Sequence, residues 1–188
     1  MESKILEKLG KTRDGLPPKN LKGRDWNALK GDVCCRVIMQ FLQDAVGPSR
    51  KVVGPNAWIR GSPTEFDLLI AGAEAVPHEL TAVYDPADVL ACLEVKEHGL
   101  FGGREQVAAA GHRKRDQFDA ICKEHSHIKC AYLTLKEAYD PVGEGSIDYL
   151  EATIDALHPY PVFCFQHSRR LRLVRTGEWD RMLAWLLG

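Results

Sequence analysis

Three charged residues at the ends of apolar segments are the strongest candidates for chemistry. Glu94 and Lys96 directly follow the apolar run 89–93, and Asp67 lies within the apolar segment 66–70. Because residues two apart in a strand share a face, Glu94 and Lys96 are expected to project together, with Val95 opposite. Placing a carboxylate and an ammonium at the tip of an apolar strand costs free energy unless they serve each other or a ligand.

Asp67 and Glu94 converge if their two strands pair. Two carboxylates, a backbone carbonyl and waters are the ligands that Mg²⁺ prefers. Such a metal lowers the pKa of a bound water and neutralises charge on a phosphate. Lys96 would orient that water or stabilise the developing negative charge. The alternative is a strand-end salt bridge between Glu94 and Lys96, with Asp67 solvated at a sheet edge.

The elements that must position these residues follow from the spacing of apolar residues. Between residues 25 and 46, Leu29, Val33, Val37 and Phe41 recur every four positions, which predicts an amphipathic helix. Three strands are predicted within 51–60, 65–71 and 88–97, and these are expected to be antiparallel. Pro55 confines the first of them to a sheet edge or splits it. The later elements are a helix over 104–124, a strand over 128–135, a helix ending near 157, strands over 161–166 and 168–175, and a closing helix. A strand–helix–strand unit gives parallel neighbours, so the expected fold is α/β, a mixed sheet with helices on both faces.

This order of elements, with its Asp and its Glu-x-Lys, resembles the PD-(D/E)XK nuclease superfamily, which has the restriction-endonuclease-like fold. The family core matches residues 25–135, so that 136–188 would add a strand and helices to a single domain spanning 1–188. The resemblance implies that Asp67, Glu94 and Val95 hold the metal and that Lys96 assists the attacking water. It also implies Mg²⁺- or Mn²⁺-dependent hydrolysis of phosphodiester bonds, with DNA as the expected substrate in restriction, defence or repair.

The sequence departs from the family pattern in the first helix. Where many members carry a supporting Glu, this chain has Cys34 and Cys35. Asp32, Glu65 and Gln117 are candidates for a supporting role, each with a plainer alternative as a solvated or strand-edge residue. An alternative function is therefore a catalytically silent nuclease-like fold that acts as a nucleic-acid-binding or assembly subunit.

The net charge of −1 weighs against a dedicated nucleic-acid binder unless basic residues gather on one face. Two basic clusters are candidates for phosphate contacts, one on the second long helix and one near the C-terminus: Arg104, Arg113 and Lys114, and Arg170 and Arg172. The alternative for each is ordinary solvated charge. One active site cuts one strand, so double-strand cleavage would need a homodimer or two events, and nothing in the sequence separates DNA from RNA.

The remaining composition points to a reducing compartment. Six cysteines occur without a Cys-x-x-Cys pair, which is typical of small buried hydrophobic residues. No apolar run approaches the roughly 20 residues that span a bilayer, and the opening residues do not resemble a signal peptide. We therefore expect a cytoplasmic protein with no membrane partner.

Overall fold

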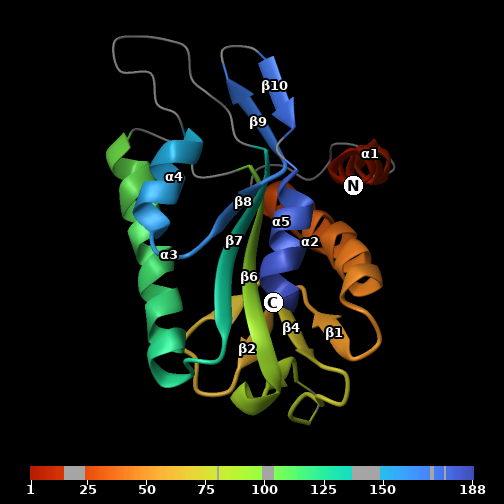
Figure 1. The fold of residues 1–188 in the computed structure, drawn as a ribbon, viewed down its shortest axis with the longest axis vertical. Helices are drawn as coiled ribbons and strands as arrows, with labels where there is room; N and C mark the ends of the chain where they lie inside the picture. Colours follow the sequence, from red (N-terminus) through yellow and green to blue (C-terminus); the bar gives the residue numbers. More distant parts are fainter. Residues whose placement is uncertain (15–23, 80, 99–103, 137–148, 170–171, 176) are drawn as a thin grey trace.

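The computed structural model describes residues 1–14, 24–79, 81–98, 104–136, 149–169, 172–175 and 177–188 (Figure 1). The helices, all but one of them α-helices, are α1 Glu2–Asp14, α2 Arg24–Val46, the short 3-10 helix η1 Pro86–Asp88, α3 Arg104–Glu124, α4 Tyr149–Leu157 and α5 Glu178–Leu187. The strands are β1 Arg50–Val53, β2 Ala57–Ile59, β3 Glu65–Phe66, β4 Leu68–Gly72, β5 Val83–Tyr84, β6 Val89–His98, β7 Lys129–Lys136, β8 Val162–Cys164, β9 Gln166–Arg169 and β10 Arg172–Arg175.

A five-stranded sheet in the order β1-β4-β6-β7-β8 forms the centre of the fold. β1, β4 and β6 are antiparallel neighbours, whereas β6, β7 and β8 run parallel. This confirms the expected mixed sheet. The long strand β6 pairs on both sides, and helices pack on both of its faces, so Ala91, Cys92, Leu93 and Val95 are buried. Leu90, near the start of the strand, is 38% exposed.

Helices cover both faces of the central sheet (Figure 1). On one face, α2 and α5 bury residues such as Val37 and Trp179, and α1 packs against α2 with Ile5 in the same apolar cluster. On the other face, α3 packs with Phe118 and Ile121, and α4 with Leu157. The apolar stripe predicted within 25–46 therefore lies on the side of α2 that packs into the core. Among the described residues, none of the helices has the length and apolar character to cross a membrane.

A second, three-stranded sheet in the order β3-β2-β5 explains where the strand predictions were too simple. The segment 51–60 is split at Pro55, one of the two outcomes expected for it, and forms β1 at the edge of the central sheet and β2 in the small sheet. Pro55 lies between them, where its missing N–H ends the ladder. The segment 65–71 is likewise divided, with β3 in the small sheet, β4 in the central sheet and Asp67 at the break.

The C-terminal segment 168–175 was predicted as one strand, and the structure instead has the antiparallel pair β9 and β10. Alternating Arg and Leu suit either arrangement, because the period of two is the same in one strand or in two paired strands.

Candidate active site

Asp67 lies at the point where the chain leaves β3 and enters β4. The next residue, Leu68, pairs with Leu93 of β6, so the antiparallel register brings Asp67 beside Glu94. The expected convergence of the two carboxylates is confirmed. It arises because β4 and β6 are direct neighbours in the central sheet.

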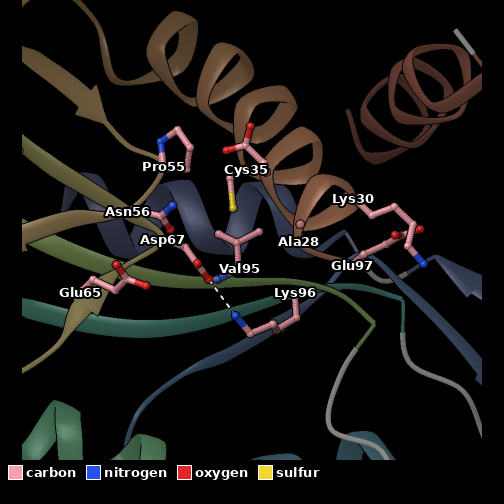
Figure 2. A pocket seen from close by; sticks show the side chains of 12 residues that line it. Ala28, Lys30, Cys35, Pro55, Asn56, Glu65, Asp67, Val95, Lys96 and Glu97 are labelled. Atoms are coloured by element: carbon pink, nitrogen blue, oxygen red, sulfur yellow. Dashed lines mark hydrogen bonds and ion pairs between the residues drawn. The ribbon is translucent and has the colours of Figure 1, made fainter. Parts of the chain in front are cut away.

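One ammonium bridges the two carboxylates. Lys96 Nζ lies 3.0 Å from Asp67 Oδ2 and 2.6 Å from Glu94 Oε1. The same Asp67 oxygen accepts a hydrogen bond from the backbone N–H of Val95 at 2.7 Å. Figure 2 shows the Asp67 carboxylate and the Lys96 ammonium pointing toward each other, joined by a dashed line. Glu94 and Lys96 thus share a strand face and form the salt bridge that the alternative expected. Asp67, which that alternative expected to be solvated at an edge, instead joins the same ammonium.

The electrostatics of the cluster follow from burial and from two neighbouring negative charges. Burial raises the pKa of the Asp67 carboxyl, and the charge of Glu94 raises it further, against the opposing effect of Lys96. Burial alone would lower the pKa of Lys96, but attraction to Glu94 and Asp67 outweighs it and raises that pKa. Lys96 is therefore firmly protonated and holds the two carboxylates together.

A pocket of about 530 Å³ opens between α2 and the sheet beside this cluster. Asp67, Val95 and Lys96 line it from the sheet (Figure 2). Cys35 reaches in from α2, and burial together with the negative charge of Asp67 raises the pKa of its thiol. Cys35 thus lies in the part of the first helix where many members of the family carry a supporting Glu, and its sulfur is directed toward Val95.

The three candidate supporting residues occupy different places. Asp32 lines the pocket from α2 and forms an ion pair with Arg36 at 2.9 Å. Glu65 lines the pocket from β3 and is exposed. Gln117 lies on α3, and its Oε1 is buried without a hydrogen-bond partner among the described residues. Asp32 and Glu65 therefore share the pocket with Asp67, whereas Gln117 is not among the described residues that line it.

The basic residues on α3 are divided between the surface and the site. Arg113 is exposed. Lys114 is turned inward, with Nζ 2.9 Å from Glu94 Oε2. Arg170 lies outside the described residues, as do the side chains of Arg104 and Arg172.

The inward position of Lys114 was missed in the sequence, although a signal for it exists. Lys114 falls three residues after Gly111 and four before Phe118, both of which are buried. Residues with that spacing share one helix face, so a charged residue there interrupts the apolar stripe. A lysine in such a position needs a buried acidic partner.

The donor set fits a hard divalent cation. The carboxylates of Asp67 and Glu94 already accept a shared positive charge, which shows that their oxygens face a common point. Within the described part of the chain, no group of three or more His, Cys, Asp or Glu side chains could hold a metal ion. Mg²⁺ suits such a sparse set, because it usually keeps several waters and binds one or two carboxylates together with substrate phosphates.

Comparison with solved structures shows the fold. The chain is similar to NucC of P. aeruginosa ATCC27853 in its cAAA-bound form, at 12% identity and a TM-score of 0.57, covering 98% of this chain and 87% of that one. It is also similar to NucC of E. coli MS115-1, cAAA-bound, at 13% identity and a TM-score of 0.59, covering 98% and 86%. The apo form of the latter matches with a TM-score of 0.51 and 12% identity, covering 81% and 82%. The fold is thus restriction-endonuclease-like, as the resemblance implied.

No family model matches the sequence. No curated protein matches it either. The likeness to NucC is therefore one of fold, and the roles of individual residues depend on the geometry described above.

Proposed function

We propose that this protein is a metal-dependent nuclease that hydrolyses phosphodiester bonds, with DNA as its substrate. The observation that carries the proposal is the shared cation position, where Asp67 Oδ2 and Glu94 Oε1 lie 3.0 Å and 2.6 Å from one ammonium. The restriction-endonuclease-like fold, which the chain shares with the two NucC structures, supports it because the superfamily that the sequence resembles has the same fold.

In this mechanism Asp67 and Glu94 hold Mg²⁺ or Mn²⁺, with the carbonyl of Val95 as the further expected ligand. The bound ion would supply Lewis-acid polarisation of a phosphate oxygen and a water of lowered pKa. Lys96, which is firmly protonated, donates hydrogen bonds and orients the attacking water. Its positive charge also stabilises the negative charge that develops on the phosphate.

The decisive experiment is cleavage of supercoiled plasmid in Mg²⁺ or Mn²⁺, with EDTA as the blank. Asp67→Asn and Lys96→Met are expected to lower the rate by about a hundredfold or more, the loss typical of removing one group that stabilises developing charge. Asp155→Asn is the matched control for the acid and Lys123→Met for the lysine, because both side chains are exposed on helices away from the pocket.

Undiminished cleavage by Asp67→Asn would contradict the assignment of the site. Absence of cleavage together with absence of metal binding would favour the silent nuclease-like scaffold. Parallel assays on single-stranded DNA and on RNA test the substrate class. The order of nicked and linear products separates a homodimer that cuts both strands together from two independent events. A cytoplasmic location stays a prediction of the sequence.

A further inference from the structure

Two lysines from two different elements divide the oxygens of Glu94 between them. Lys96 of β6 holds Oε1 at 2.6 Å, and Lys114 of α3 holds Oε2 at 2.9 Å. Only 8% of the Glu94 side chain and 18% of the Lys114 side chain are exposed. This carboxylate is therefore bound on both edges in a place that water reaches poorly.

Lys114 differs from the adjacent Arg113 in its exposure and in its ion pairing. Arg113 is exposed and forms no ion pair with the described residues, as expected for a surface cation. Lys114 instead crosses from α3 to the sheet, where Glu94 pairs in register with Tyr132 of β7. Its ammonium contacts Glu94, and the side chain is largely withdrawn from solvent.

We propose that Lys114 is a positioning residue that fixes the orientation of the Glu94 carboxylate. The inference rests on the proposed function, because the orientation matters only if Glu94 holds a metal. A carboxylate group turns readily about its terminal bond. When each oxygen has its own cation, the group is locked, with Oε1 directed toward the Lys96 ammonium that also contacts Asp67. Without Lys114, both oxygens are free to pair with Lys96, which already stands between the two acids.

Removal of Lys114 should change the Kd for the metal in opposite directions for a positioning role and for simple charge repulsion. Removing a nearby positive charge reduces its repulsion of a divalent cation, so loss of charge alone would tighten binding. Loss of orientation weakens binding instead, because the ion must then compete with Lys96 for a carboxylate that no longer faces it. Residues that orient metal ligands typically contribute 10–100-fold to affinity.

The experiment is a calorimetric titration of Mn²⁺ into the full chain. We expect Lys114→Met to raise the Kd about tenfold. Lys114→Arg restores a cation at the same position, and its Kd should lie closer to wild type than that of Lys114→Met. Arg113→Met, which removes the same charge from the adjacent exposed residue, should leave the Kd unchanged or slightly lower. An unchanged or lowered Kd for Lys114→Met would overturn the positioning role.

Two further comparisons make the outcome interpretable. Urea unfolding in EDTA checks that Lys114→Met is folded. If it is not, Lys114→Gln replaces it, and binding no weaker than that of Lys114→Arg counts against the role.

Asp67→Asn reports on the proposed function itself. If wild type binds Mn²⁺ and Asp67→Asn does not, while Lys114→Met matches wild type, only the inference about Lys114 fails. If wild type binds no Mn²⁺, even with duplex DNA present, both fail.

Discussion

The backbone N–H of Val95 donates a hydrogen bond of 2.7 Å to the Asp67 carboxylate. The oxygen that accepts it also binds Lys96 at 3.0 Å. Asp67 is therefore tied to the backbone and to a side chain of the same strand, β6. The acid belongs to the structure of the sheet as well as to the candidate site, and substitutions there affect stability and chemistry separately.

Asp67→Ala and Asp67→Asn should differ in stability although both lose metal binding. Ala leaves the Val95 N–H, in a residue that is only 3% exposed, without its acceptor. An unsatisfied buried donor costs about 1–3 kcal/mol. Asn keeps an oxygen that can accept the bond, so its free energy of unfolding should exceed that of Ala by about 1 kcal/mol or more. Urea unfolding in EDTA measures the difference, and equal stabilities would mean that water replaces the acceptor.

Protonation of Asp67 should contribute to the pH dependence of the free energy of unfolding. Its pKa in the folded protein is raised above the ordinary value of 3.8, chiefly by burial and then by Glu94. Between the two pKa values the folded state holds more protons than the unfolded state, so stability decreases as the pH rises through that window. Relative to Asp67→Asn, wild type should lose stability as the pH rises above about 4. Asp155→Asn, altered at an exposed helix position, should follow wild type throughout.

Gly54 is required by a close approach to the acid. A Cβ at this position would lie 2.5 Å from the backbone oxygen of Asp67 and 2.7 Å from Leu68 Cδ2, and φ is +150°. Gly54→Ala should therefore destabilise the fold by more than 2 kcal/mol and weaken Mn²⁺ binding by shifting Asp67.

Gly61→Ala is the matched control for Gly54→Ala. Its φ is +87°, but nothing lies within 4 Å of the added Cβ. Gly61→Ala should therefore lose only the free energy of holding a non-glycine residue at positive φ, about 1 kcal/mol of stability. If the two variants were equally stable and bound Mn²⁺ equally, the contact between Gly54 and Asp67 would have no influence on the site.

Cys35→Glu tests the position of the missing supporting acid. The thiol is 3% exposed and lines the pocket with Asp67. A third carboxylate there would repel Asp67 and Glu94, so the thermal midpoint in EDTA should fall. Mn²⁺ should then raise that midpoint by more than it raises the wild-type midpoint, because a ligand that binds the folded state stabilises it. Cys34→Glu is the control, since Cys34 is buried at 1% exposure and does not line the pocket. Equal Mn²⁺ rescue of both variants would refute the specific placement of Cys35.

The parts of the site that could be predicted from sequence are those governed by strand periodicity. A period of two places Glu94 and Lys96 together, and antiparallel pairing of two neighbouring apolar segments brings Asp67 to them. The division of segment 65–71 at Asp67 could not be predicted, because it depends on two sheets competing for one run of apolar residues. The role of Lys114 was obscured for another reason. In a sequence rich in basic residues on one helix, a lysine that faces inward is identified only by its phase relative to Gly111 and Phe118.

Asp67 lies between β3 and β4 and therefore connects the small three-stranded sheet to the central sheet. Glu94 and Lys96 are fixed in β6, which is flanked on both sides and admits little movement. Asp67 is held from one side by β4 and from the other by β3, whose partner β2 belongs to the small sheet. The position of Asp67 relative to Glu94 thus depends on the pairing of β3 with β2 as well as on that of β4 with β6. Substitutions in β2 or β3 offer a route by which evolution can retune the proposed cation site without altering the strand that carries Glu94 and Lys96.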